Sequence, residues 1–236
     1  MGRRYPAHTF SFDIWELYMF NTELFFNSIP ILASAAVVTF KLFVCCVCLS
    51  LMFGTLSVML QLSNNRCGYW LSRTYVSLMR GTPLLVQLFV IFFGLPLLGI
   101  KGQAFLAAAL AIGLNSGAYT TEILRAGIQN VPVGHLEAAA SIGMSRLRTW
   151  TRVVFPQAFT VSLPALTNEF TIVLKSTPLA SVVAVTELTY AGVLIQARAF
   201  SAIEIFLPIA IGYIVITLSF TQLARWLERR LRDFHT

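Results

Sequence analysis

Residues 131–156 read VPVGHLEAAASIGMSRLRTWTRVVFP, a polar and basic segment between two long apolar stretches. The segment holds an ordered pattern of small, acidic and helix-breaking residues: Glu137, Ala138, Ala139, then Gly143, then Val153, Phe155 and Pro156. A membrane chain seldom devotes this much sequence to one polar loop unless the loop contacts another molecule. The segment therefore predicts a docking element between two membrane spans.

The composition of this loop predicts two short helices that meet at an angle. Pro132 suits a first helical turn, Gly134 interrupts it, and residues 135–141 are rich in Ala, the best helix former. Gly143 allows a sharp backbone turn, and Ser145 is placed to cap a second helix that starts at Arg146. Two short helices at such an angle can transmit the rigid-body motion of a soluble partner to the membrane spans on either side.

The overall composition is that of a membrane protein. Hydrophobic residues make up 57% of the 236 residues, charged residues make up 11%, and the mean hydropathy is +0.75. The four cysteines, Cys45, Cys46, Cys48 and Cys67, form neither a paired extracellular framework nor a CxxC metal site. We expect them to be reduced packing residues, and we expect no metal site.

Five segments are long and apolar enough to cross a bilayer as helices, which takes about 20 residues. They cover about residues 31–62, 84–100 with an extension back through Tyr75, 104–128, 153–173 with a weaker apolar run at 179–185, and 203–223. The predicted fold class is therefore an all-α membrane protein with about five transmembrane helices. The sequence Gly81-Thr82-Pro83 predicts a helix break at the membrane edge.

Residues 10–26 mix acidic and aromatic side chains, which predicts a helix on the membrane surface. We therefore divide the chain into an N-terminal periplasmic or interfacial segment, 1–26, and a transmembrane domain, 27–236. Residues 223–234 alternate apolar and basic side chains at helical spacing and predict an amphipathic cytoplasmic extension.

Basic residues predict the orientation of the spans through the positive-inside rule. Eleven basic residues fall on the side of the 129–156 loop and four on the other. The eleven are Arg66, Arg73, Arg80, Arg125, Arg146, Arg148, Arg152, Arg225, Arg229, Arg230 and Arg232; the four are Arg3, Arg4, Lys101 and Arg198. The loop and the C-terminus are thus predicted to be cytoplasmic and the N-terminus outside. The net charge of +7 follows from this bias, with anionic lipid rather than nucleic acid as its partner.

The spacing within the loop resembles the cytoplasmic EAA loop of ATP-binding-cassette (ABC) import permeases: Glu-Ala-Ala, three residues, Gly, nine residues, two apolar residues one apart, then Pro. Three further stretches resemble the polar amino-acid uptake branch of these permeases (histidine, arginine and glutamine permeases). They are RGTPLLVQ at 80–87, GAYTTE at 117–122 with RAGI at 125–128, and NEF at 168–170 followed by KST at 175–177. That branch usually has Lys-Asp-Thr-Ser-Leu where this chain has Lys175, Ser176, Thr177, Pro178 and Leu179.

The resemblance implies the type I ABC importer permease fold in a bacterial cytoplasmic (inner) membrane. It implies a second permease subunit, identical or a sister chain, two cytoplasmic ATPase subunits, and an extracytoplasmic amino-acid-binding protein. ATP and Mg²⁺ would bind the ATPase, since this chain has no GxxxxGK[ST] motif and no expected cofactor or catalytic residue. The implied ATPase-coupling residues are Pro132, Gly134, Glu137, Ala138, Ala139, Gly143 and Arg146.

Ionisable residues inside spans are costly and so are candidates for function. Glu169 is predicted to attract a cationic substrate, and the alternative is an internal ion pair with Lys41 or Lys175. Lys175 is also a candidate for the substrate carboxylate, and Asn168, Tyr119 and Thr120 for neutral contacts, although such groups serve equally to join helices. Glu122 precedes Arg125 by three residues, which predicts a local ion pair.

The favoured function is import of polar, basic amino acids such as arginine, lysine, histidine or an opine. A permease for glutamine or cystine is the alternative, followed by an ion-coupled secondary transporter, although five spans with one large loop show no repeated halves. Catalysis is disfavoured because His8, His135 and His235 are scattered along the chain. Flux without ATP would identify a channel.

Overall fold

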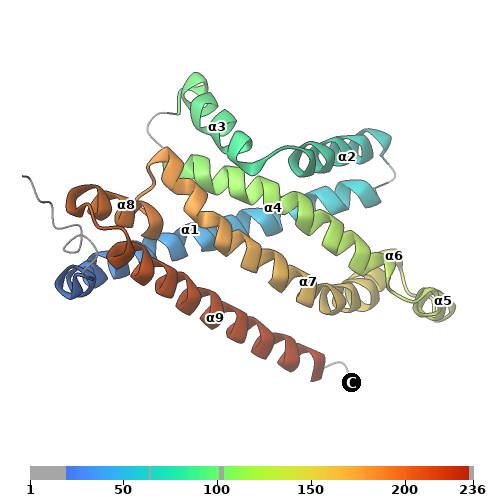
Figure 1. The fold of residues 1–236 in the computed structure, drawn as a ribbon. Coiled ribbons are helices and arrows are strands. Elements are labelled where there is room, and N and C mark those ends of the chain that lie inside the picture. Colours follow the sequence, from blue (N-terminus) through green and yellow to red (C-terminus); the bar gives the residue numbers. More distant parts are fainter. Residues whose placement is uncertain (1–19, 64, 101–103, 234–236) are drawn as a thin grey trace, which may run out of the picture.

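The computed structural model describes residues 20–63, 65–100 and 104–233, and the regular structure in this part of the chain is entirely helical (Figure 1). The predicted all-α class is therefore confirmed. The elements are α1 (Thr22–Leu62), α2 (Arg66–Gly81), α3 (Leu84–Gly94), η2 (Leu95–Leu98), α4 (Ala104–Gln129), α5 (Val133–Ser141), α6 (Arg146–Thr149), η3 (Trp150–Val154), α7 (Phe155–Ser176), η4 (Thr177–Val183), α8 (Leu188–Ala199) and α9 (Ile203–Asp233).

Three of these helices, α1, α4 and α9, are long and apolar enough to cross a membrane. Two bent units qualify as well, residues 66–98 with a bend of 111° and residues 146–199 with a bend of 46°. Together they make up to five spans, at the positions predicted from the sequence. α1, α4, α7 and α9 run side by side, while α2 and α3 lie along one flank (Figure 1).

The second predicted span, about residues 84–100 with its extension back through Tyr75, is sharply bent. Thr82 has φ −121° and ψ 147°, the extended conformation that a residue before proline favours, and Pro83 is the cap residue before α3. The predicted break at Gly81-Thr82-Pro83 is thus confirmed. It turns the apolar helix α3 sharply away from α2.

The ends of the chain differ from expectation. α1 starts at Thr22, because the Asn21 side chain accepts a hydrogen bond from the Leu24 amide at 2.9 Å and caps the helix. Residues 22–26 therefore continue the first span, whereas a separate surface helix was predicted over 10–26; residues 10–19 of that prediction lie outside the described residues. The predicted C-terminal extension is a continuation of α9 as far as Asp233.

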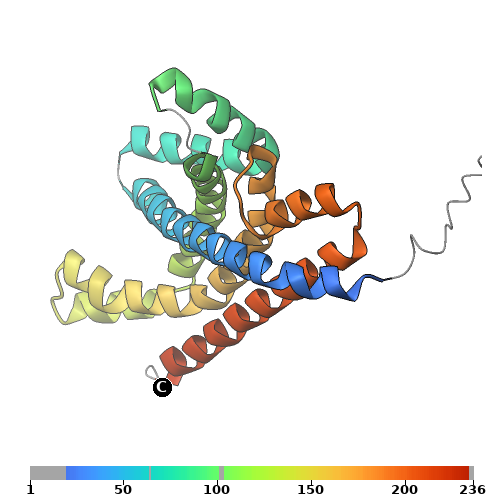
Figure 2. The ribbon, with the colours of Figure 1, turned by 90° about the vertical axis from the view of Figure 1, so that its left-hand side faces the viewer.

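The two ends of the bundle carry different elements. α5 and α6 project beyond the end of α4 and the start of α7, and the C-terminal end of α9 points toward the same side in both views (Figures 1 and 2). α8 and the start of α1 lie at the opposite end. The loop and the C-terminal helix thus share one side of the bundle, as the charge distribution predicts; the side of the membrane stays a prediction.

α1 and α4 make the most extensive helix contact of the core. A Cβ atom on Gly54 of α1 would lie 2.5 Å from Cγ2 of Thr120 on α4 and 3.1 Å from the carbonyl oxygen of Gly117. In lipid, helices associate through such close backbone approach, because apolar side chains gain little by leaving hydrocarbon. The crossing places the polar face of α4 against α1.

We expect Gly54→Ala to destabilise the permease bundle. The added methyl group collides with Thr120 and Gly117, so the free energy of unfolding should fall by about 1–3 kcal/mol, the usual range for overpacking. The midpoint of thermal unfolding in detergent measures the effect. Gly94→Ala is the matched control, because nothing lies within 4 Å of its added Cβ. Equal midpoints for both variants would contradict the close crossing.

Candidate functional site

A chain of buried hydroxyl groups leads to the carboxylate of Glu169. The Ser116 hydroxyl donates to Glu169 Oε1 at 2.8 Å, and the Ser50 hydroxyl donates to Ser116 Oγ at 2.9 Å. Thr120 Oγ1 lies 2.8 Å from Ser50 Oγ and is the donor there, because Ser50 already donates its proton. The chain links α1, α4 and α7, and Glu169 is 8% exposed at its end.

Glu169 has no ion-pair partner in the described part of the chain. The single salt bridge among those residues joins Glu122 and Arg125, and both Lys41 and Lys175 are exposed. The alternative in which Glu169 pairs with Lys41 or Lys175 is therefore wrong for this conformation. Among the described residues, the Ser116 hydroxyl is the hydrogen-bond donor to this carboxylate, and the Arg80 guanidinium acts on it electrostatically without forming a salt bridge.

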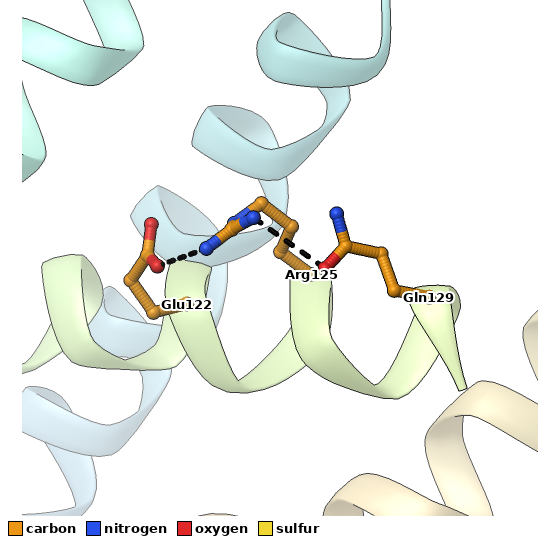
Figure 3. A network of polar contacts seen from close by, with 3 residues as sticks. All are labelled: Glu122, Arg125 and Gln129. Carbon is orange, nitrogen blue, oxygen red and sulfur yellow. Dashed lines mark hydrogen bonds and ion pairs between the residues drawn. The ribbon is translucent and has the colours of Figure 1, made fainter.

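The predicted local pair on α4 is confirmed. Arg125 Nη2 lies 2.6 Å from Glu122 Oε2, and Arg125 Nη1 lies 3.5 Å from Gln129 Oε1, so the arginine lies along one face of the helix (Figure 3). The pair bridges successive turns of one helix and spans no interface. The Glu122 carboxylate faces the middle and the end of α2, residues 73–81.

A hollow of about 440 Å³ opens between α2 and α4 next to this pair. The Arg80 guanidinium lies over the Tyr119 ring, 5.1 Å from its centroid, a cation–π geometry. The lining residues carry both charge signs and one aromatic face: Arg73, Val76, Ser77, Arg80, Gly81, Tyr119 and Glu122. α4 thus turns Ser116 and Thr120 toward the core and Tyr119 and Glu122 toward the hollow.

Arg80 and Arg73 were not among the predicted substrate residues. The available signal was the position of Arg80 directly before Gly81-Thr82-Pro83, where a helix end exposes the side chain of its last turn. Which residue of α4 the arginine would meet could not be inferred, because it depends on how α2 packs against α4.

The break itself is stabilised by two amide side chains. Pro83 has no N–H, so the Met79 carbonyl four residues earlier loses its helical partner. Gln87 Nε2 donates to that carbonyl at 2.8 Å, and Asn115 Nδ2 donates to it at 2.9 Å. Gln87 also donates to Thr82, and Asn115 to Gln87 Oε1 at 3.1 Å. These bonds hold the turn against α4.

The five predicted substrate residues fall into three places. Glu169 and Thr120 belong to the buried chain, and Tyr119 lines the hollow beneath Arg80. Asn168 is exposed, and Lys175 is exposed beside a separate hollow of about 310 Å³ that Tyr213 and Thr217 also line. Within one chain they do not surround a single cavity.

The loop at residues 129–156 contains the two predicted helices, with corrections to both starts. Pro132 precedes α5, and Gly134 lies inside this helix where an interruption was predicted. Ser145 occupies the cap position of α6, but its side chain makes no capping hydrogen bond. The helix instead begins with the Thr149 amide bonded to the Ser145 carbonyl at 2.9 Å.

The predicted turn at Gly143 is present and has a defined form. Gly143 has φ +72°, its amide donates to the Ala140 carbonyl at 2.9 Å, and the Met144 amide donates to the Ala139 carbonyl at 3.0 Å. This pair of bonds is a Schellman motif, which requires the left-handed conformation that glycine adopts readily. Ala139 is buried, whereas Glu137, Ala138 and Arg146 are exposed.

The base of the loop is fixed to the start of α7. Val131, Val154 and Ala158 form a small buried cluster, and His135 Nδ1 lies 2.8 Å from Gln157 Oε1. Between α6 and α7 runs a π-helical turn, η3, in which the Phe155 amide donates to the Trp150 carbonyl, five residues back. Such turns recur at functional sites, and this one joins the loop to a span.

Residues 47–233 match the family described as the binding-protein-dependent transport system inner membrane component. The chain belongs to this family. It is 38% identical over 203 residues to the L-cystine transport system permease protein TcyB of Bacillus subtilis (strain 168), covering 86% of this chain and 87% of that one. It is 34% identical over 215 residues to the glutamine transport system permease protein GlnP of Escherichia coli (strain K12), covering 90% and 98%.

A solved structure agrees with this assignment. The crystal structure of an amino acid ABC transporter with histidines superposes with a TM-score of 0.83 at 36% identity, covering 89% of this permease and 99% of that chain. The protein is therefore a permease subunit of an amino-acid ABC importer, with the importer permease fold, and it is an inner membrane component. The family implies an ATPase and a binding protein as partners.

We expect Ser116→Ala to destabilise this permease by breaking the buried hydroxyl chain at its centre. Glu169 would lose its one side-chain donor among the described residues, and an unsatisfied buried acceptor costs about 1–3 kcal/mol. The midpoint of thermal unfolding in detergent should fall accordingly. Ser34→Ala is the control, because that exposed hydroxyl bonds only the Ile31 carbonyl of its own helix. If Ser116→Ala and Ser34→Ala unfold alike, the chain does not stabilise the bundle.

Proposed function

We propose that this permease imports basic amino acids, of the arginine, lysine, histidine or opine type, and that Glu169 attracts their cationic side chain. The observation that carries the proposal is the state of Glu169, a nearly buried carboxylate bonded to Ser116 and unpaired with any Lys or Arg of the described chain. A carboxylate inside a membrane protein is costly without a partner. A cationic substrate supplies that partner during transport.

The hollow beside Arg80 supports recognition of the part that all α-amino acids share. Its two arginines can attract a carboxylate, Glu122 can attract an ammonium group, and the Tyr119 ring offers an aromatic face. The hollow therefore does not select among the side chains of the substrate. For this reason, import of glutamine or cystine stays the alternative. The names of the relatives, which include L-cystine and glutamine, point the same way.

The remaining predicted substrate residues have separate roles in this proposal. Thr120 orients the hydroxyl chain that ends at Glu169, and Tyr119 holds Arg80 in the hollow. Asn168 and Lys175 are exposed on α7, so their contact with substrate requires that this face of α7 line the pathway next to the second permease subunit. Lys175 would then meet the substrate carboxylate.

The loop at 129–156 would dock onto a dimer of ATPase subunits, which bind ATP and Mg²⁺. Its exposed residues form the docking surface: Pro132, Gly134, Glu137, Ala138 and Arg146. Ala139 and Gly143 keep the angle between α5 and α6 through the Schellman motif. A binding protein on the opposite side delivers the amino acid, and a second permease subunit, identical or a sister chain, completes the pathway.

The substrate proposal is tested with the full importer reconstituted in liposomes. Glu169→Gln should lower ATP-driven uptake of labelled arginine about tenfold, which corresponds to about 1.4 kcal/mol of lost attraction, and should leave glutamine uptake unchanged. ATP hydrolysis stimulated by the binding protein is measured beside uptake. It should change less than arginine uptake.

Glu204→Gln is the matched control for this substitution. Glu204 is 6% exposed and accepts from the Asn21 amide at 3.0 Å and the Ser201 hydroxyl at 2.5 Å, but it lies at the start of α9. The Glu204→Gln importer should take up arginine and glutamine as the unmodified importer does. If Glu169→Gln lowers arginine uptake and ATP hydrolysis equally, Glu169 has a structural role. If the unmodified importer takes up glutamine but not arginine, the alternative substrate class is favoured. Uptake of either without ATP would contradict the coupling.

We expect Gly143→Val to uncouple the loop from the ATPase. A β-branched residue at φ +72° is strained by at least about 1 kcal/mol, so the Schellman turn should open and the angle between α5 and α6 should change. ATP-driven uptake should fall, and hydrolysis should no longer respond to the binding protein. Gly94→Ala, in α3 outside the loop and with nothing within 4 Å of the added Cβ, should keep both activities. Normal stimulation in Gly143→Val would contradict a coupling role for this turn.

A further inference from the structure

An apolar groove of about 290 Å³ lies where the end of α1, the end of α4 and the start of α7 meet. Its walls include Met59, Leu62, Leu124, Ile128, Trp150 and Phe155. Only two hydroxyl groups, those of Thr55 and Thr151, interrupt the hydrocarbon lining, and the Thr151 hydroxyl is bonded to the Leu147 carbonyl at 2.9 Å. The groove therefore offers almost nothing to a polar ligand.

The groove lies at the end of the bundle that carries the coupling loop. Along α1 it extends from Thr55 to Leu62, the last residue of the helix, which is about 10 Å at 1.5 Å per residue. On α4 it ends at Ile128, one residue before the end of that helix, and on the other side it reaches Trp150, the first residue of η3. The helices α4 and α7 are joined at this end of the bundle by the coupling loop (Figure 1). In an integral membrane protein this depth corresponds to the outer part of the hydrocarbon core beneath one leaflet's headgroups.

The rim of the groove is exposed and apolar. Met59 is 63% exposed, Phe155 58% and Trp150 40%. A tryptophan at this level is typical of the membrane interface, where its indole has one apolar side and one polar N–H. A contiguous apolar surface of this kind requires a hydrocarbon or protein partner.

Two arginines stand close to the rim residue Trp150 in the sequence, and the acidic residues nearest to it in the sequence are Glu137 and Glu169. Arg148 and Arg152 flank Trp150 on α6 and η3, and both are exposed. The sequence has no Asp or Glu between Glu137 and Glu169, and the one salt bridge of the described residues, Glu122 to Arg125, uses neither arginine. Long cationic side chains next to a membrane span reach to the headgroup layer and attract anionic lipid.

We propose that this groove binds one acyl chain of an anionic phospholipid, with its phosphate paired to Arg152. An acyl chain matches the hydrocarbon lining and the depth, and a negative headgroup matches the unpaired arginines beside it. A second permease subunit would need a complementary charged surface over Arg148 and Arg152 as well as an apolar ridge. The bound lipid would lie between α1, α4 and the turn that links the coupling loop to α7.

The test uses the fluorescence of Trp150 in the full importer in nanodiscs. The Trp150 signal is the difference between the unmodified importer and the Trp150→Phe variant, measured with phosphatidylglycerol or phosphatidylcholine carrying brominated acyl chains. Brominated phosphatidylglycerol should quench this signal at about fivefold lower mole fraction than brominated phosphatidylcholine, the effect of about one basic residue at the headgroup. Arg152→Gln should remove most of that preference.

Two substitutions on neighbouring positions of α1 separate the groove from the general lipid surface. Thr55→Phe fills the groove and should abolish most of the quenching, whereas Leu56→Phe adds the same ring outside it, where Leu56 is 54% exposed, and should leave quenching unchanged. The proposal is overturned by equal quenching in Thr55→Phe and Leu56→Phe, by equal quenching with the two headgroups, or by a Trp150 signal in the assembled importer that neither lipid quenches, which would show that a subunit covers the groove.

Discussion

The carbonyl of Met79 has no backbone amide to bond, because the residue four positions later is Pro83, and inside a membrane protein such a group must be satisfied by the protein itself. Two side chains from different helices meet this requirement, Gln87 of α3 and Asn115 of α4. Their bonds fix the 111° bend between α2 and α3 and hold it against α4. The Asn115 bond holds the end of α2 against α4, next to the contact of Arg80 with the Tyr119 ring in the hollow between these two helices.

The second break in the bundle is stabilised in the same way, with a carboxylate in place of amides. Glu187 is fully buried and caps α8 by accepting from the Thr189 and Tyr190 amides at 3.0 and 2.8 Å. The Tyr213 hydroxyl of α9 donates to it at 2.7 Å, and Thr39 of α1 accepts from the Leu188 amide at 3.0 Å. Both interruptions of the helical spans are thus tied to neighbouring helices, which allows irregular backbone inside an otherwise helical bundle.

The sequence predicts features that depend on local chemistry and misses those that depend on a distant partner. Five apolar segments, the turn at Gly143, the break at Pro83 and the pair of Glu122 with Arg125 follow from residues close together in the chain. The size of the bend, the Met79 partners and the burial of Glu187 require knowledge of which helices meet. Glu169 shows the limit clearly, because a search for opposite charges suggested Lys41 or Lys175, whereas a serine on α4 is its partner. Its role in transport stays a prediction.

The connection between the loop and Glu169 runs along a single helix. The cluster of Val131, Val154 and Ala158 and the contact between His135 and Gln157 bind the loop to the first turns of α7, so a displacement of the loop must move the start of that helix. Glu169 lies fourteen residues after Phe155, about 21 Å along α7. Between them, Pro164 removes the amide that would bond the Thr160 carbonyl, which leaves α7 easier to bend at this position than elsewhere. We therefore expect a displacement of the loop to tilt residues 155–163 of α7 about Pro164. The resulting strain would act on the bond between Ser116 and Glu169, which holds the part of α7 after Pro164 against α4.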